Sequence, residues 1–341
     1  MGTRDTRGLK QLFDQIYTKM NNKRKVLVVD GLNLFFRAYA TNPVTDNNGD
    51  PVGGLVGSLR SIGSVIRDTE VTQVIVVFDG RGGSSKRKKI FPDYKKGRKM
   101  TMRMNRLFDF DTDEEREQNM KRQILALGAY LDYLPIKVIA VDNLEADDII
   151  AYICLNYLQD VETVIMSSDK DFLQLVNHNT NVWAPTKKKM YDIDRVLEEY
   201  KIHPHNITIN RVLDGDKSDN IDGVKGFGVK RLAKMFPFLT EEKKYTLDEI
   251  KEYAEENKDT YSLYGRLIDE FDKVERNNQL MNLHLLDFNT NAKLKIQAFM
   301  NEDPPKLNKM GLLLRFSKDG LSHAFHNFPD WISKTFINVK K

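Results

Sequence analysis

Val26-Leu-Val-Val-Asp30 is a short run of branched apolar residues that ends in an acid. The same arrangement recurs in Val74-Ile-Val-Val-Phe-Asp79 and in Val164-Ile-Met-Ser-Ser-Asp169. Short apolar runs separated by helical patterns are typical of buried strands in a parallel sheet. We therefore expect an α/β fold with a mostly parallel central sheet flanked by helices. The expected strands are Val26–Val29, Val74–Phe78, Val138–Val141 and Val164–Met166.

The acids that end three of these runs have two explanations. Each could simply cap the helix that follows it, and for a single Asp this is the better explanation. In a parallel sheet with right-handed crossovers, however, the carboxyl ends of the strands lie along one edge. Neighbouring strands are about 4.8 Å apart, so carboxylates on adjacent strand ends can share a cation. The recurrence of the pattern favours a shared site for Asp30, Asp79 and Asp169.

A further acidic cluster, Glu145-Ala-Asp147-Asp148, follows the expected strand Val138–Val141. On a helix, Glu145 and Asp148 share a face, and Asp147 lies beside them. Acids in a first turn also stabilise the helix through its dipole, which is the purely structural explanation. The apolar continuation Ile149-Ile-Ala indicates that this helix packs on the sheet, with its acidic turn at the same edge.

The second half of the chain adds Asp171 and the turn Gly215-Asp216-Lys-Ser-Asp219-Asn220. A turn rich in Gly, Asp and Asn is normally only a turn. Here it is followed by Gly223-Val-Lys-Gly226-Phe-Gly228-Val-Lys230-Arg231-Leu-Ala-Lys234, a glycine-punctuated turn that leads into a basic helix. Glycines let a backbone approach a phosphate closely, and the start of a helix offers free N–H donors to it.

All these candidate ligands are carboxylates. Many carboxylates in one place repel, so some must be protonated or neutralised by cations. Oxygen ligands favour a hard ion such as Mg²⁺ or Mn²⁺, and none of the six histidines has zinc-binding spacing. Acid-rich sites of this kind suit two-metal hydrolysis of a phosphodiester.

The overall composition is that of a soluble globular protein of 341 residues with a net charge of +4. Eleven Lys or Arg residues lie between Arg81 and Arg106, and this basic block suits a polyanion, although a solvated loop is an equal explanation. The single cysteine, Cys154, excludes an intrachain disulfide and indicates a reducing compartment. With no membrane-length apolar run and no signal peptide, we expect a cytoplasmic protein.

The acidic motifs Val29-Asp30-Gly31, Phe78-Asp79-Gly80, Glu145-Ala-Asp147-Asp148, Ser168-Asp169-Lys-Asp171 and Gly215-Asp216-Lys-Ser-Asp219-Asn220 occur in the order of a known family. From about Lys25 to its end, the sequence resembles the 5′ nucleases, which are the flap endonucleases and the 5′-nuclease domains of bacterial DNA polymerase I. Within them it is most similar to the ribonuclease H of T4-type bacteriophages. This resemblance implies a sheet flanked by helices with a helical arch over the active site.

The resemblance also assigns roles to residues. Two Mg²⁺ ions, which Mn²⁺ can replace, are expected at Asp30, Asp79, Glu145, Asp147, Asp148, Asp169, Asp171, Asp216 and Asp219. The first five acids of this series would hold the ion nearer the scissile phosphate, and the last four would form or support the second site. Asp147, Arg87 and Lys95 are the expected catalytic residues, the latter two by polarising the phosphate.

DNA contacts are expected from two regions. The arch would contribute Arg87, Lys95, Arg98 and Tyr94, which could stack on a base or simply pack on the surface. A helix–turn–helix would grip the duplex phosphates with Lys225, Gly226, Gly228, Lys230, Arg231 and Lys234. In relatives this turn can also bind K⁺ through backbone carbonyls.

The expected organisation has three parts. Residues 1–24 form an appendage in which Leu9, Leu12 and Phe13 have helical spacing and could bind a sliding clamp, or pack on their own domain. Residues 25–200 form the nuclease core, with the arch at about 81–117. Residues 201–341 form a mostly helical DNA-binding part, with the helix–turn–helix at about 213–236. A monomer is expected, with branched or RNA-primed DNA, and a single-stranded-DNA-binding protein, as partners.

The expected function is therefore a metal-dependent 5′ to 3′ exonuclease and flap endonuclease that removes RNA primers and 5′ flaps during phage DNA replication. The alternative is a non-catalytic, structure-specific DNA-binding protein of the same fold. A dehalogenase-type phosphatase is disfavoured because Asp30-Gly-Leu32 lacks the second acid which that chemistry needs. A dinucleotide enzyme is disfavoured because Gly226-Phe-Gly228 does not follow a strand.

Overall fold

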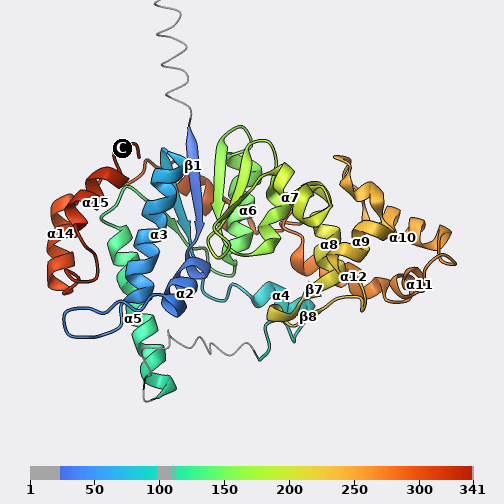
Figure 1. The fold of residues 1–341 in the computed structure, drawn as a ribbon, viewed down its shortest axis with the longest axis horizontal. Coiled ribbons are helices and arrows are strands. Elements are labelled where there is room, and N and C mark those ends of the chain that lie inside the picture. Colours follow the sequence, from blue (N-terminus) through green and yellow to red (C-terminus); the bar gives the residue numbers. More distant parts are fainter. Residues whose placement is uncertain (1–23, 98–109, 111, 340–341) are drawn as a thin grey trace, which may run out of the picture.

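The centre of the molecule is a six-stranded sheet with the strand order β3-β2-β1-β4-β5-β6 (Figure 1). The computed structural model describes residues 24–97, 110 and 112–339. Every pairing is parallel except that of β5 with β6. The mostly parallel sheet and the four expected strands are confirmed. The strands are β1 Lys25–Asp30, β2 Gln73–Val77, β3 Lys137–Ile139, β4 Glu162–Met166, β5 Thr180–Ala184 and β6 Lys189–Tyr191.

The sequence analysis missed β5 and β6. In β5, Thr180, Val182 and Ala184 are buried while the two residues between them are partly exposed. This alternation lacks the continuous apolar run of the inner strands. Only a short 3₁₀ helix, η1 Lys170–Leu175, lies between β4 and β5, so the helical signal of a usual crossover is also absent.

One face of the sheet is covered by helices from both ends of the chain. Leu27, Val29, Val74 and Val76 point into this layer. The covering helices are α2 Gly31–Thr41, α3 Gly53–Thr69, α5 Asp113–Leu131, α14 Lys309–Lys318 and α15 Phe328–Thr335 (Figure 1).

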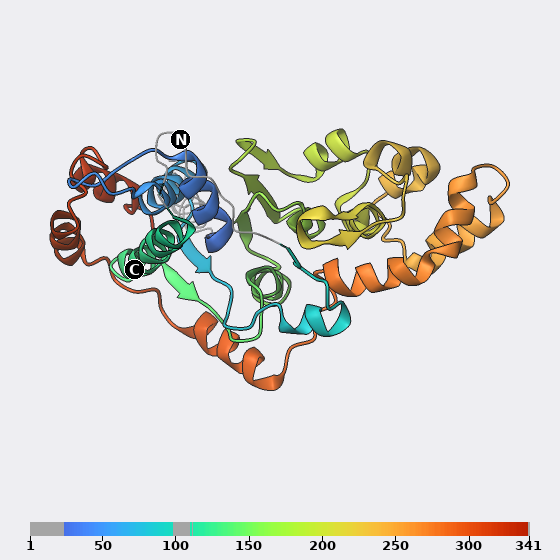
Figure 2. The same ribbon diagram turned by 90° about the horizontal axis from the view of Figure 1, so that it is seen from below.

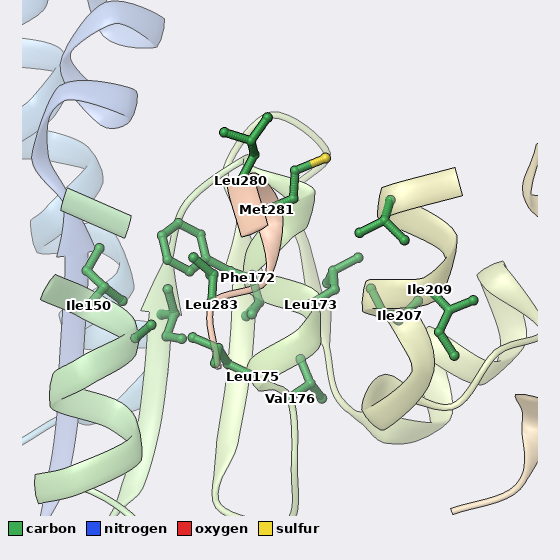
Figure 3. Packing of buried hydrophobic residues seen from close by; sticks show 14 of the residues in the cluster. Ile150, Phe172, Leu173, Leu175, Val176, Ile207, Ile209, Leu280, Met281 and Leu283 are labelled. Atoms are coloured by element: carbon green, nitrogen blue, oxygen red, sulfur yellow. The ribbon is translucent and has the colours of Figure 1, made fainter. Parts of the chain in front are cut away.

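The opposite face is covered by α6 Ala146–Tyr157, α8 Ile207–Asp214 and α12 Phe271–Met281. Figure 3 shows Phe172 of η1 between Ile150 of α6 and Leu283, which follows α12. This hydrophobic cluster runs from Val26 to Ile296. The expected boundary near residue 200 therefore does not separate two cores, because α8 and α12 complete the layer that begins on the sheet.

The segment after α7 (Ile193–Tyr200) is mostly helical, as expected. The stretches Leu247–Tyr253 and Tyr261–Phe271 lie largely in helices. The expected helix–turn–helix consists of α8, a small hairpin of β7 (Gly215–Asp216) and β8 (Ile221–Asp222), a turn, and α9 (Val229–Met235). The remaining elements here are η2 Pro204–Asn206, η3 Lys217–Asp219, η4 Pro237–Thr240, α10 Leu247–Glu256, α11 Ser262–Asp269 and α13 Thr290–Asn301.

The C-terminal helices do not join that helical part, which corrects the expectation of one unit over residues 201–341. They return to α3, where Arg67 Nη1 donates to Thr335 Oγ1 at 2.6 Å and Arg60 Nη2 donates to the Ala324 carbonyl at 2.6 Å. Their apolar side chains belong to the layer on the α3 face, because that layer would otherwise leave α3 exposed.

The expected arch is described only at its two ends. Its first end holds α4 Ser85–Ile90 and a turn to Gly97, and its second end is the start of α5. Arg98 and the candidate clamp-binding residues Leu9, Leu12 and Phe13 lie outside the described residues. In the part of the chain that the structure describes, no helix combines the length and the apolar character needed to cross a bilayer.

Candidate active site

The carboxyl edge of the sheet opens into a cleft of about 540 Å³. All the predicted metal-site acids except Asp148 line it, together with Arg87, Tyr94 and Lys95. Figure 2 views the molecule from below, where α4 and the β7–β8 hairpin lie close to the start of α6. Segments that are far apart in sequence therefore meet at one edge, as the parallel sheet predicts.

Two of the three strand-end acids cap the turn that follows them, and all three line the same cleft. Asp30 Oδ1 accepts from the Asn33 amide at 3.1 Å, and Asp169 Oδ1 accepts from the Asp171 amide at 2.8 Å. Capping fixes the orientation of each carboxylate. Both acids also line the cleft.

The first acid group lies at the start of α6. One ligand oxygen from each of Glu145, Asp147 and Asp148 lies within 4.8 Å of the others, a spacing that suits a shared cation. Asp79 joins this group because its Oδ1 accepts from the Ala146 amide at 2.7 Å. That bond ties the end of β2 to the first turn of α6.

Arg87 lies inside the first acid group. Its Nη1 contacts Glu145 Oε2 at 2.5 Å and Asp148 Oδ2 at 2.9 Å, and its Nη2 contacts Asp147 Oδ2 at 3.2 Å. Its Nε donates to the Leu280 carbonyl at 2.8 Å, and the residue is 8% exposed. The guanidinium is thus bonded to protein acceptors at the wall of the cleft, and the DNA-binding and catalytic roles of Arg87 stay predictions.

Lys95 and Tyr94 connect the first acid group to the β7–β8 hairpin. Lys95 Nζ contacts Glu145 Oε1 at 2.5 Å, and its backbone N–H donates to the Asp219 carbonyl at 2.9 Å. The Tyr94 hydroxyl donates to Glu145 Oε2 at 3.0 Å and lies 3.2 Å from Asp219 Oδ2. Since Tyr94 is only 2% exposed, its ring cannot stack on a base here, which corrects the stacking alternative.

The second acid group consists of Asp169, Asp171, Asp216 and Asp219, and it contains Arg211, which the sequence analysis missed. Arg211 Nε contacts Asp171 Oδ1 at 2.5 Å, and its Nη2 contacts Asp216 Oδ2 at 2.7 Å. A signal was present, because Arg211 interrupts the apolar run Ile207-Thr-Ile-Asn-Arg-Val-Leu. A cation in a buried helix face requires a buried partner.

Ser167 was also missed, and it links two strand ends. Its hydroxyl donates to Asp30 Oδ2 at 3.1 Å and accepts from the Asp169 amide at 3.1 Å. The residue is 1% exposed. It therefore sets the relative position of Asp30 and Asp169, and a serine at the end of a strand gave no specific signal of this.

The cleft favours the neutral form of several acids. Burial raises the pKa of Asp30 to about 7, and the nearby acids Asp169 and Asp79 add to the effect. Burial, with Asp169, also raises the pKa of Asp171 to about 7, although Arg211 opposes the rise. The protein's own cations therefore do not neutralise this many carboxylates.

In the first acid group, the neighbouring cations affect the pKa of each acid differently. Burial, together with Asp148 and Glu145, raises the pKa of Asp147 although Arg87 opposes it. The pKa of Glu145 is lowered, because attraction to Arg87 and Lys95 outweighs the cost of burial. An all-oxygen donor set with residual negative charge fits a hard divalent cation.

The predicted phosphate-binding residues of the helix–turn–helix lie away from the acids, on the turn before α9 and on α9 itself. Lys225, Lys230, Arg231 and Lys234 are exposed. The turn is held internally, since Arg231 Nη1 donates to the Gly226 carbonyl at 2.9 Å. Gly226 has φ +104°, a conformation that side chains with a Cβ rarely adopt.

A parallel sheet whose carboxyl edge gathers acids from strands, α6 and a hairpin defines a class of protein, the acid-centred phosphodiester hydrolases. Residues 25–201 match the family model of the 5′-3′ exonuclease N-terminal resolvase-like domain. The chain therefore belongs to the 5′-3′ exonuclease family, and it is a nuclease.

Individual relatives agree with this family. The 5′-3′ exonuclease of Aquifex aeolicus is 31% identical over 209 residues, which are 61% of this chain and 67% of that protein. DNA polymerase I of Bacillus subtilis is 30% identical over 70% of this chain and 27% of the polymerase. The D15 flap endonuclease of bacteriophage T5, solved with DNA and metal ions, has the same fold with a TM-score of 0.60. Its identity is 20%, over 86% of this chain and 100% of that one.

Proposed function

We propose that the chain is a divalent-metal-dependent 5′ nuclease that removes RNA primers and 5′ flaps from branched DNA during phage replication. The observation that carries the proposal is the cleft in which acids from three strand ends, α6 and the β7–β8 hairpin meet. The T5 relatives support it, because one is described as a flap endonuclease with DNA and metal ions and another as a 5′-exonuclease with bound zinc. The closeness to the T4-type ribonuclease H stays a prediction.

Two Mg²⁺ ions are the proposed cofactors, with Mn²⁺ as a substitute. Asp30, Asp79 and the Glu145–Asp148 cluster would hold one ion, and Asp169, Asp171, Asp216 and Asp219 would hold or support the other. Such ions supply activation of water and charge stabilisation at the phosphodiester that breaks.

Lys95 is the proposed catalytic cation of the protein itself. Its ammonium group lines the cleft and its side chain is 22% exposed, so it can reach a phosphate at the mouth of the acid site. Glu145 holds it in place. A positive charge fixed before the substrate arrives stabilises the charge that develops on the phosphate.

The exposed cations on and before α9 are the proposed grip on the duplex, through phosphates rather than bases. The proposal also includes a K⁺ ion in the turn, a sliding clamp that binds at Leu9, Leu12 and Phe13, and a single-stranded-DNA-binding protein as a partner. The protein itself is proposed to be monomeric and cytoplasmic. The K⁺ ion, the clamp and the single-stranded-DNA-binding protein rest on the family resemblance alone.

The decisive test is cleavage of a 5′-labelled flap in Mg²⁺ by the wild type and by Asp147→Asn. The variant should lose at least roughly 100-fold in rate, because it removes one charge from the first acid group. Asp160→Asn, an exposed acid in the loop before β4, is the matched control and should cleave normally.

Product sizes on flap, nicked and RNA–DNA substrates would then separate flap endonuclease, exonuclease and primer-removing activities. The rival is a non-catalytic protein that only binds branched DNA. Equal cleavage by the wild type and Asp147→Asn, or DNA binding without any product, would favour that rival and reject the proposed site.

A further inference from the structure

The second acid group holds its own cation in a fixed place. Arg211 is 5% exposed and contacts Asp171 of η1 through Nε and Asp216 of β7 through Nη2, at 2.5 and 2.7 Å. The two carboxylates belong to elements on either side of α8 in the chain. The guanidinium therefore bridges two parts of the cleft that no backbone pairing joins directly.

Arg211 is not free to swing away from these acids. Its neighbours on α8, Val212 and Leu213, are fully buried, as is Ile207 at the start of the helix. Figure 3 shows Ile207 and Ile209 of α8 in the packed cluster near Leu173. The helix that carries the guanidinium is thus anchored in the core, which keeps Arg211 next to the second acid group.

The contacts of Asp216 show what this means for an added ion. Its Oδ2 accepts from Arg211, while its Oδ1 accepts from the Ser218 amide at 2.7 Å and from the Ser218 hydroxyl at 2.6 Å. Both oxygens are already occupied. A divalent ion that approached this carboxylate would have to displace a bond and would face the charge of Arg211.

We propose that Arg211 is a positioning residue that acts as the resident counter-ion of the second acid group, holding Asp171 and Asp216 together without a metal and competing with a divalent ion for them. The inference rests on the proposed function, which places the second ion among these acids. The physical basis is that carboxylates this close repel one another, and a buried acid that loses its cation is left uncompensated.

Two opposite effects follow when the charge is removed. Without metal, Arg211→Gln leaves the carboxylates uncompensated, so the protein should unfold at a temperature lower by roughly 5 °C or more. With metal, the freed carboxylates should bind the weaker of the two Mn²⁺ ions at least about threefold more tightly than in the wild type. A residue with a merely structural role would weaken or preserve metal binding, not strengthen it.

The experiment uses the full-length protein freed of metal with a chelator, and Mn²⁺ alone as the probe. Isothermal titration calorimetry gives the affinities, and thermal unfolding is followed with and without saturating Mn²⁺. Because Mn²⁺ takes over the role of the lost cation, it should raise the unfolding temperature of Arg211→Gln more than that of the wild type. Arg211→Lys keeps the charge and should resemble the wild type in both measurements.

Arg195→Gln is the control, since it breaks an ion pair with Glu198 at the surface of α7. Unchanged or weaker Mn²⁺ binding by Arg211→Gln, or an equal Mn²⁺ effect on both unfolding temperatures, would overturn the proposal for Arg211. If Arg211→Gln does not fold, the Mn²⁺ affinity of Arg211→Lys is the deciding measurement. An affinity that differs from that of the wild type would also contradict the proposal. No Mn²⁺ binding by the wild type would instead reject the metal-dependent function itself.

Discussion

At the scale of single residues, the cleft combines acids with cations that the protein supplies itself. Arg87 lies among Glu145, Asp147 and Asp148, and Arg211 lies between two acids of the second group. Buried ion pairs of this kind contribute little net stability, because desolvation offsets their attraction. Their effect here is to hold many carboxylates in one place before any other cation arrives.

Ser167 gives a prediction at this scale. Ser167→Ala removes the hydroxyl that joins Asp30 Oδ2 to the Asp169 amide in a buried position. We expect the free energy of unfolding to fall by about 1–2 kcal/mol, as for loss of a buried hydrogen bond. We expect flap cleavage to fall roughly tenfold, because two acids lose their relative position. Urea unfolding and single-turnover cleavage measure the two effects.

The control for this prediction is Ser333→Ala, which removes an exposed hydroxyl on α15. Wild-type cleavage by Ser167→Ala would show that backbone and capping bonds alone position the two acids.

At the scale of elements, the segment that follows α12 fastens the helical part to the sheet. Gln174 of η1 is buried, and its side chain donates to the Met281 carbonyl at 3.1 Å and accepts from the Leu283 amide at 2.9 Å. Figure 3 shows Met281 and Leu283 beside η1. The ring Nε2 of His284 lies 3.2 Å from the Gln174 carbonyl and continues this junction.

This junction predicts a pH dependence of stability. Burial lowers the pKa of His284 below its ordinary value of 6.5, and Lys244 and His205 add to this while the bond to Gln174 opposes it. The folded state thus favours neutral His284, so its contribution is fully present above pH 6.5. It is lost as the pH falls below that value, where the unfolded chain binds the proton first.

The measurement compares the wild type with His284→Gln by urea unfolding at pH 7.5 and pH 5.5. The wild type should lose more stability over this range than the variant, whereas His326→Gln, at an exposed position, should follow the wild type. Parallel losses in all three proteins would mean that His284 does not titrate between the two states.

At the scale of the whole molecule, the basic helix α9 lies with α10 and α11 on one side of the sheet, while α14 and α15 lie at the opposite end (Figure 1). DNA held by α9 would extend from the cleft and avoid the C-terminal helices. If α9 holds the DNA as proposed, binding and cleavage depend on separate residues and should respond separately to mutation.

The double variant Lys230→Ala and Lys234→Ala tests this separation. The plot of log affinity against log salt should become shallower by about 2, because two phosphate contacts are lost. The maximal cleavage rate at saturating DNA should stay within about twofold, since neither lysine lines the cleft. Fluorescence anisotropy over a salt series measures the first effect, and single-turnover kinetics measures the second.

Lys318→Ala with Lys334→Ala removes two exposed lysines from the C-terminal helices and should leave the salt dependence unchanged. An equal effect of both double variants would point to nonspecific charge rather than to a defined DNA path.

Much of the fold and of the acid site could be predicted from the sequence, because the signals are local. A run of Val and Ile predicts a buried strand, and in a parallel sheet the residue after each strand must lie at one edge, so Asp30, Asp79 and Asp169 had to meet. The position of the acidic first turn of α6 could also be predicted, because the apolar residues that follow it, Ile149-Ile-Ala, indicate a helix that packs on the sheet.

Other features were decided only by tertiary structure. Arg211 and Asp171 are 40 positions apart. The sequence around either residue does not indicate that the two form an ion pair. The same holds for the return of the C-terminal helices to α3 and for Arg87, which turns from the basic block into the acids. Local sequence determines which groups need burial or a counter-charge, but only the packed chain determines which group supplies it.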